Sequence, residues 1–492
     1  MRFWPRFRKF SQPGVADMRS VFSPIEKFGE TLTPNMRALR LTMTASDLLL
    51  SMGVPANSVV GKALDITETY CKRPVHIDIN ANLLMLSQLR GTDKEPLTMF
   101  RPVPARAINY MTVQAVQHLI YEIHEGKHTL EQAELILEEI LKQKHRYPWW
   151  VVMLGNGGIV AGVALMFSTS WRVIMVTFVI GLLTDRLLAY FTRHDVPSFF
   201  RQVGAAAFIT ILAALINLLA SHHVNFFHGM NPTLMVVGGI VMLVAGLVIV
   251  GAIQDAIEEY YLTATSRILK VGMLTVGIIV GILIALYTAR KLGFGIAVSP
   301  NPLHLTAIHF QVAGGAIAAA AYAMNTQTRI RAIIWAGILG GAALAIMYGA
   351  AHIDVSIVPA SGLAAVVVGL IATLFSRLWR TPSVGIVACA IVPLVPGLAL
   401  YTAMMQLVNY PAGSPLFFMG IGSLFTAIST ALAIAAGASF GSLLGRPLHQ
   451  NLAHNRNLQP FVDFMRRQIK VDRRYRLAGF VLHQPDDDMN TK

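Results

Sequence analysis

Charged residues and cysteine are both scarce in this chain. Only 13% of its 492 residues are Asp, Glu, Lys or Arg, whereas 54% are hydrophobic, and the mean hydropathy is +0.55. Water-soluble folds usually carry more charge than this, so the composition indicates a membrane protein. The 2 cysteines argue against a disulfide framework and against a cysteine-based metal site. We expect no metal and no cofactor.

Signatures of several other protein classes are missing. The chain has no G-x-x-x-x-G-K-[ST] motif, which argues against an ATP-driven pump, and no G-x-S-x-G motif accompanies His76 and Asp78 on their predicted strand. The first ten residues lack the apolar core of a secretory signal. Much of the excess positive charge behind the net +14 lies in the C-terminal tail and in short loops, where membrane orientation explains it better than nucleic-acid binding. We therefore expect a protein that is not an enzyme and binds no nucleic acid.

Ten apolar segments follow Pro148, each long enough to cross a hydrocarbon core of roughly 30 Å as a helix. The predicted spans are 149–167, 172–191, 200–220, 232–254, 268–288, 305–325, 330–350, 356–376, 382–407 and 416–444. Nine Lys and Arg residues lie in the short loops on the side of the N-terminus, and three lie on the other side, namely Arg172, Arg290 and Lys291. The positive-inside rule then places both termini in the cytoplasm.

The polar first 148 residues are predicted to form a small cytoplasmic α+β domain. Two helical patterns meet near Gly53, the stretch PVHIDIN alternates with period two, and Thr129 and Gln132 have the spacing of a capping box at the start of a helix. We expect this domain to gate or regulate the cytoplasmic entrance. The predicted boundaries are 1–148 for this domain, 149–295 and 296–445 for the two halves of the membrane region, and 446–492 for a basic cytoplasmic tail.

The two halves of the membrane region share a sequence pattern. Val241–Asp255 and Val392–Gln406 both contain V-x-L-V-x-G-L at an offset of 151 residues, and two looser matches follow the same order. Five spans is an odd number, so the second half would enter the membrane from the opposite side. The sequence thus predicts a polytopic α-helical membrane protein with about ten transmembrane helices, arranged as a five-plus-five inverted repeat.

Two prolines interrupt the ninth predicted span. Pro393 and Pro396 stand in IVPLVPGLALY, and Pro393 lies about eleven residues, or roughly 16 Å, into the span. A proline in a helix interior costs roughly 3 kcal/mol, and many transporters bind their solutes near the midplane at helices broken by Gly or Pro. We predict a substrate site at this break, with a simple kink as the alternative. The predicted substrate-binding residues are Gly246, Pro393, Pro396, Gly397, Gln406 and Asn217.

Ionisable side chains near membrane depth are candidates for proton coupling. Asp185 lies beside Arg186 toward the cytoplasmic end of the second span, Asp255 and Glu258 lie at the cytoplasmic end of the fourth, and His309 lies near the outer end of the sixth. The alternatives are an interfacial ion pair, a solvated loop face and a packed imidazole, respectively. Several amides could bind a polar solute or merely join helices by hydrogen bonds: Asn217, Gln254, Gln311, Asn325 and Gln406.

The whole layout resembles the threonine/serine exporter family. The stretches that carry the resemblance are LLLSMGVPANSV, RPVPARAINYMTVQAVQHLIYEIHEGKHTLEQAELILEEI, YPWW, LMFSTSW and LVPGLALY. Ser168 and Thr169 stand where the family often has two glycines, a departure confined to an outer turn. The resemblance implies export of L-threonine and L-serine across a bacterial inner membrane, driven by the proton motive force. Residue by residue, it carries over only to Pro393, Pro396 and Gly397.

Other interpretations stay open. Split two-subunit relatives of the resembled family are associated with succinate export, which makes a small dicarboxylate the alternative solute, although no Arg or Lys falls near a predicted midplane. A membrane-anchored hydrolase working through the N-terminal domain is another, but ten spans are more than an anchor needs. A channel is a further one, and it would not accumulate solute against a gradient. A homo-oligomer is compatible with the sequence, which does not fix the oligomeric state.

Overall fold

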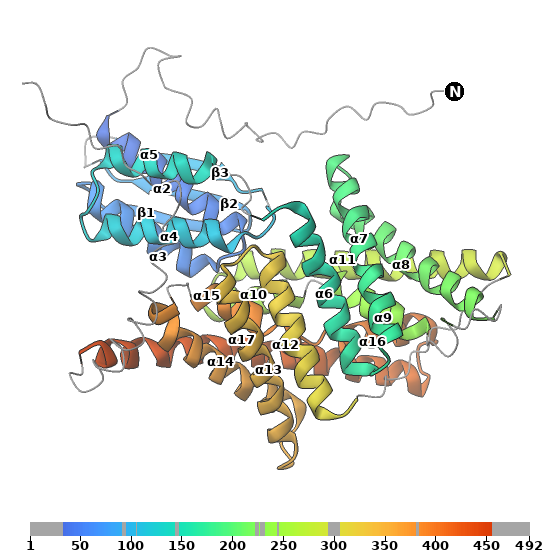
Figure 1. The fold of residues 1–492 in the computed structure, drawn as a ribbon. Coiled ribbons are helices and arrows are strands. Elements are labelled where there is room, and N and C mark those ends of the chain that lie inside the picture. The colour runs from blue at the N-terminus through green and yellow to red at the C-terminus, as the bar shows by residue number, and fades with distance from the viewer. Residues whose placement is uncertain are drawn as a thin grey trace, which may run out of the picture.

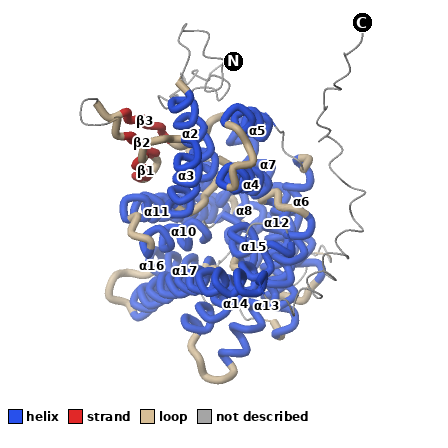
Figure 2. Tube along the Cα trace, turned by 90° about the vertical axis from the view of Figure 1, so that its left-hand side faces the viewer, coloured by secondary structure: helices blue, strands red, loops and turns tan. Residues whose placement is uncertain are grey.

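The N-terminal helices and strands lie together at one end of the molecule, and the long helices occupy the rest (Figure 1). The computed structural model describes residues 33–90, 95–104, 106–142, 147–221, 226, 232–243, 246–293, 306–379 and 383–454. The first 32 residues and the predicted basic tail beyond residue 454 lie outside the described residues. Figure 2 shows strands only at the N-terminal end of the part that it describes.

The N-terminal elements are helices packed with one small antiparallel sheet. Its three strands have the order β1-β2-β3, and Val75 pairs with Gln88 at one end of the first hairpin and Asn80 with Leu83 at the other. The elements in chain order are α2 (Pro34–Ser51), α3 (Ala56–Tyr70), β1 (Val75–Asn80), β2 (Leu83–Gln88), β3 (Leu97–Pro102), α4 (Tyr110–His124) and α5 (Leu130–Lys142).

Local sequence signals explain where these helices begin and end. At the start of α2, the Thr33 hydroxyl accepts a hydrogen bond from the Met36 amide at 3.4 Å, and the helix is followed by Gly53 at φ +86°, a conformation that glycine adopts most readily. The predicted capping box before α5 is confirmed. The Thr129 amide donates to Gln132 Oε1 at 3.0 Å, and the Gln132 amide donates to Thr129 Oγ1 at 3.4 Å.

The membrane region is entirely helical where it is described. Its elements are α6 (Trp149–Phe167), α7 (Trp171–Arg193), α8 (Ser198–Ser221), α9 (Pro232–Leu243), α10 (Gly246–Ile257), α11 (Tyr261–Lys291), α12 (Ile308–Asn325), α13 (Ile330–Ala351), α14 (Ile357–Trp379), α15 (Ser383–Ala390), the short 3₁₀ helix η2 (Val392–Leu394), α16 (Gly397–Asn409) and α17 (Pro415–His454).

Seven helices of the described chain are long and apolar enough to cross a membrane, namely α6, α7, α8, α11, α13, α14 and α17. The chain is therefore a polytopic α-helical membrane protein. The remaining predicted spans are present in another form. The fourth span is described as α9 and α10 on either side of residues 244–245, which lie outside the described residues, the ninth is divided into α15, η2 and α16, and α12 has polar ends that lower its hydropathy.

Glycines allow the long helices to approach one another closely. On α6 and α12, a Cβ added to Gly162 would lie 2.6 Å from the Gly314 carbonyl oxygen, and a Cβ on Gly314 would lie 2.5 Å from the Gly162 oxygen. Gly281 of α11 meets the Val203 carbonyl of α8 in the same way, and Gly441 of α17 meets Val366 of α14. Small residues at these contacts let the helix backbones approach, as is common where helices pack in membranes. In Figure 1, α14 and α17 run together across α12 and α13.

A valine at Gly281 should destabilise the protein, because its side chain would overlap the Val203 carbonyl and the Ala206 methyl group of α8. Overpacking of this kind costs about 1–3 kcal/mol. Gly272 on the same helix is the matched control, since a Cβ there meets nothing within 4 Å. We expect Gly281→Val to lower the thermal unfolding midpoint of the detergent-solubilised protein by several degrees more than Gly272→Val. Equal midpoints would show that α8 and α11 are not held by this contact.

Candidate functional site

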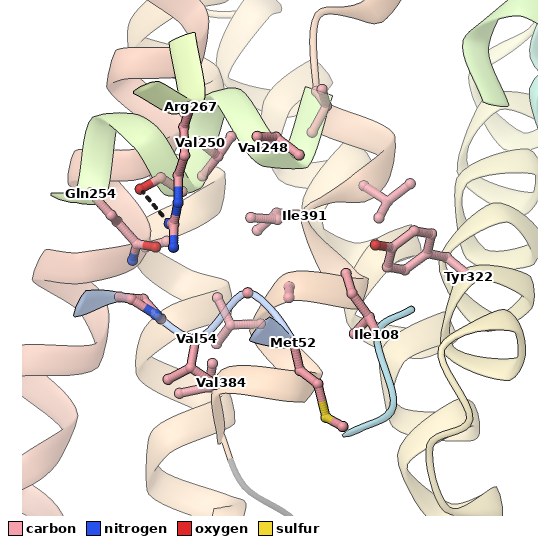
Figure 3. Close-up of a pocket in the computed structure, with 18 of the residues that line it drawn as sticks. Met52, Val54, Ile108, Val248, Val250, Gln254, Arg267, Tyr322, Val384 and Ile391 are labelled. Carbon is pink, nitrogen blue, oxygen red and sulfur yellow. Dashed lines mark hydrogen bonds between the residues drawn. The ribbon is translucent and has the colours of Figure 1, made fainter. Parts of the chain in front are cut away.

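A cavity of about 1240 Å³ lies between the N-terminal elements and the membrane helices. The turn between α2 and α3, including Met52 and Val54, forms one side of it (Figure 3). Other walls come from α6, α10, α11, α12, α15 and α17, with Tyr322 of α12 facing Val248 and Arg267 across the space in Figure 3. Cavities of this size and mixed polarity are the usual places for small solutes to bind.

The predicted break in the ninth span lies on this cavity. The helix ends at Ala390, continues as one 3₁₀ turn, and begins again at Gly397, and Pro393 and Gly397 both line the cavity. Pro396 contributes to a much smaller cavity of about 20 Å³, together with Leu400 and Ala427. A 3₁₀ stretch within a helix often marks a functional hinge.

The fourth predicted span also borders this cavity. Met242 and Leu243 of α9 and Val248 and Val250 of α10 line it. Residues 244 and 245, between α9 and α10, lie outside the described residues, so the equivalence of Gly246 with the break in the ninth span stays a prediction.

Asp185 belongs to a chain of polar contacts that reaches the cavity. Asn325 Nδ2 donates to Asn156 Oδ1 at 2.7 Å, and Asn156 Nδ2 donates to Asp185 Oδ1 at 2.5 Å. Both asparagines line the cavity, whereas Asp185 is buried behind them. Arg186 pairs with the same carboxylate and stacks over the Trp149 ring at 4.7 Å. The predicted Asp185–Arg186 neighbourhood is thus an ion pair linked to the cavity through α6 and α12.

Asp255 joins the membrane helices to the N-terminal elements. Its Oδ1 accepts a hydrogen bond from the Ala56 amide at 3.0 Å, and its Oδ2 lies 2.6 Å from Arg267 Nη1, while the residue is 0% exposed. Pro55, at the N-cap of α3, makes no side-chain cap of its own, so Asp255 supplies the anion at this helix N-terminus. We call Ala56, Asp255 and Arg267 the Asp255 junction.

Other contacts dock the N-terminal elements on two loops of the membrane region. Thr263 Oγ1 accepts from the Ala81 amide at 3.1 Å, next to the Asp255 junction. At the turn between α12 and α13, the Tyr110 amide donates to the Thr326 carbonyl at 3.0 Å, and the Tyr147 hydroxyl donates to the Thr328 carbonyl at 2.7 Å. The N-terminal elements therefore bridge the α10–α11 and α12–α13 turns.

A buried ion pair of the N-terminal elements borders the cavity. Arg106 lines the cavity and donates through Nη2 to Asp47 Oδ2 at 3.1 Å. Burial raises the pKa of the Asp47 carboxyl, while the positive charges of Arg106 and Arg101 act to lower it. The pair therefore places the Arg106 guanidinium at the cavity wall, and the Asp47 carboxylate beside it is buried.

The other predicted residues lie in different places. Glu258 lines the cavity, and His309 is exposed with its ring 4.3 Å from the Phe310 ring. Gln406 is buried and accepts from Ser423 Oγ at 3.5 Å, so it joins α16 to α17. Asn217 is half-buried on α8 and is not among the residues that line the cavity.

The basic side chains of this site were not predicted from the sequence. Arg267 and Lys270 line the cavity, although in the sequence they indicated only the orientation of the chain in the membrane. Asn156 was also missed as a site residue. The available signal was the pair of opposite charges, Asp255 and Arg267, on either side of a short turn between two apolar helices.

Replacing Asp255 by alanine should loosen the start of α3, because Ala56 loses its acceptor and Arg267 loses its buried partner. Breaking a buried ion pair costs at least about 3 kcal/mol, so hydrogen exchange at the Ala56 amide should accelerate by about two orders of magnitude. Glu139→Ala, at an exposed position on α5, is the control and should leave that amide protected. Unchanged exchange in Asp255→Ala would show that the Asp255 junction does not hold the N-terminal elements.

Comparisons with known proteins agree with this architecture. A family model for threonine/serine exporters, ThrE, matches residues 40–289, and a second model, "Threonine/Serine exporter, ThrE", matches residues 311–444. No solved structure shows a significant match.

Curated relatives match over most of the chain. A "Probable threonine/serine exporter" of Mycobacterium tuberculosis is 30% identical over 421 residues, which are 84% of this chain and 77% of that protein. A "Threonine/serine exporter" of Corynebacterium glutamicum is 26% identical over 84% of this chain and 83% of its own length. The "Probable succinate transporter subunit YjjP" of Escherichia coli is 26% identical over 52% of this chain and 96% of its own length. These matches run along both parts of the membrane region, and they show that this chain belongs to the threonine/serine exporter family.

Proposed function

We propose that this chain exports L-threonine and L-serine from the bacterial cytoplasm by proton antiport with alternating access. The observation that carries the proposal is the cavity of about 1240 Å³ at the break of the ninth span, in a chain of this family. Broken helices expose backbone carbonyls and amides, which suit the ammonium and carboxylate groups of a zwitterion. Cavity-lining amides such as Asn325 and Gln254 add polar contacts without net charge.

An inverted repeat of five helices supports alternating access. The V-x-L-V-x-G-L pattern recurs at an offset of 151, and the helix pairs that contact each other in the first half recur in the second, with α6–α7 and α8–α11 matched by α12–α13 and α14–α17. The two family models also divide the chain between residues 289 and 311. We propose halves at 149–295 and 296–445.

The N-terminal residues 1–148 are proposed as a cytoplasmic α+β domain that controls access to the cavity. The α2–α3 turn forms part of the cavity wall, and the Asp255 junction fixes this turn. Both chain ends would lie in the cytoplasm of a bacterial inner-membrane protein, as the distribution of Lys and Arg favours. An anchored hydrolase has less support, since the cavity is shared with the membrane helices.

Asp185 is our preferred residue for proton coupling. Its carboxylate is buried, yet Asn156 and Asn325 connect it to the cavity. Asp255 is held by two partners in the Asp255 junction, which favours a structural role. Glu258 lines the cavity and is the second candidate, whereas the exposed His309 is the weakest.

Succinate is the second candidate solute. Arg106, Arg267 and Lys270 line the cavity, and basic side chains suit a dicarboxylate. The named function of the Escherichia coli relative points the same way, although its match covers only 52% of this chain.

Purified protein in liposomes with an acidic interior should take up labelled L-threonine and L-serine several-fold faster than without a pH gradient, because protons leaving the lumen would drive solute entry. Labelled succinate in the same vesicles tests the alternative. Protein-free liposomes report leakage. Succinate uptake without amino-acid uptake would replace the proposed solute, and amino-acid uptake that ignores the gradient would remove proton antiport.

Two sets of variants separate coupling from solute passage in those vesicles. Asp185→Asn should keep the exchange of labelled for unlabelled threonine but lose the response to the pH gradient, while Asp354→Asn, at an exposed turn, should change neither. Pro393→Ala combined with Pro396→Ala should lower both activities at normal protein abundance, with the exposed Pro411→Ala as control. Gradient-driven uptake by Asp185→Asn would exclude Asp185, and full activity of the double proline variant would leave the prolines as kinks.

A further inference from the structure

Arg267 presents unused hydrogen-bond donors to the cavity. Its Nη1 lies 2.6 Å from Asp255 Oδ2 and 3.5 Å from the Gly251 carbonyl oxygen. Its Nε and Nη2 make no hydrogen bond to any residue in the described ranges, and the side chain is 17% exposed and lines the cavity. The Nε and Nη2 groups of a guanidinium form the fork that binds a carboxylate through two parallel hydrogen bonds.

An amide oxygen lies beside this fork. In Figure 3 the side chain of Gln254, from α10, points toward the guanidinium of Arg267, from α11. Gln254 Nε2 donates to Ser439 Oγ on α17 at 3.0 Å, which fixes the orientation of the amide. The Gln254 oxygen accepts no hydrogen bond from the described residues, so it can accept one from a ligand.

The charges of the cavity wall favour an anionic group at this place. The charged side chains that line the cavity in the described structure are Arg106, Arg267, Lys270 and Glu258, three cations against one anion. Arg106 is already paired with Asp47. Arg267 is the cation toward which the Gln254 side chain points (Figure 3).

We propose that Arg267 binds the carboxylate of the transported solute and that Gln254 Oε1 accepts a hydrogen bond from its ammonium group, with Ser439 as a positioning residue for Gln254. This subsite rests on the proposed function, since it requires the solute to be an α-amino acid. The Gln254–Ser439 hydrogen bond joins α10 to α17, so the subsite lies where the two proposed halves meet. A bound solute would contact the half that carries Arg267 and adjoin the half that carries Ser439.

The carboxylate contact is tested first on the unaltered protein. Isothermal titration of the full chain in detergent compares L-threonine with L-threoninamide, which keeps the ammonium and hydroxyl groups but lacks the carboxylate. We expect L-threonine to bind at least about tenfold more tightly, the range typical of a hydrogen bond to a charged group. Equal affinities would overturn the carboxylate contact without any reliance on a variant.

Variants then locate that contact. Asp255→Asn combined with Arg267→Gln removes both charges of the pair, so no unpaired charge is left buried, and it should lower L-threonine affinity to that of the amide while amide affinity stays the same. Gln254→Leu should weaken both ligands equally, because both carry the ammonium. Ser439→Ala should lower the affinity for both ligands by less than Gln254→Leu does. Ser439→Thr keeps a hydroxyl at this position, so both affinities should equal those of the unaltered protein. Arg201→Gln, whose guanidinium bonds Thr192 and Ser198 away from the cavity, is the matched control and should change nothing.

The remaining outcomes separate this inference from the proposed function. If the double variant still binds L-threonine more tightly than L-threoninamide, the assignment to Arg267 is overturned. The assignment is also overturned if Lys270→Gln removes this difference in affinity. If the protein binds succinate and not L-threonine, the amino-acid function fails, and the Arg267 contact is judged by succinate against succinamate in the same double variant. Binding of neither L-threonine nor succinate would overturn the subsite.

Discussion

Backbone hydrogen bonding in a bilayer constrains this structure more than any other factor. Within the hydrocarbon core each N–H and C=O group needs a partner in the protein or in enclosed water, so a chain crosses as helices, and a departure from helix is tolerated beside a cavity. The break between η2 and α16 borders the cavity of about 1240 Å³. The Gly162–Gly314 contact reflects a related constraint, because close backbone approach replaces the hydrophobic effect that would drive packing in water.

Features set by neighbouring residues could be predicted from the sequence. The capping box at Thr129 and the break at Pro393 both follow from local backbone chemistry. Contacts between distant segments could not be predicted. Ala56 and Asp255 are 199 residues apart, and Asn156 and Asn325 are 169 apart, and a single sequence does not say which helices meet. The role of Arg267 was missed for this reason, since its position shows a charge but not the cavity that it faces.

The proposed halves and the N-terminal elements form three walls of the cavity. The N-terminal elements contact the α10–α11 turn through Thr263 and the α12–α13 turn through Tyr110, so they touch both halves at once. A rocking motion of the halves would therefore change the distance between these two docking points. Control of access by the N-terminal elements and solute exchange at the breaks would then be parts of one motion.

The Asp255 junction also has a consequence for assembly during synthesis. A ribosome makes α3 long before α10, so the Ala56 amide emerges without the acceptor that it has in the finished protein. Domains generally fold as they are made, beginning from the N-terminus. Here the first turn of α3 reaches its final hydrogen bonding only when α10 and α11 have been inserted and folded back against it. The hydrogen bond of the Ala56 amide therefore forms only after this part of the first membrane half has assembled.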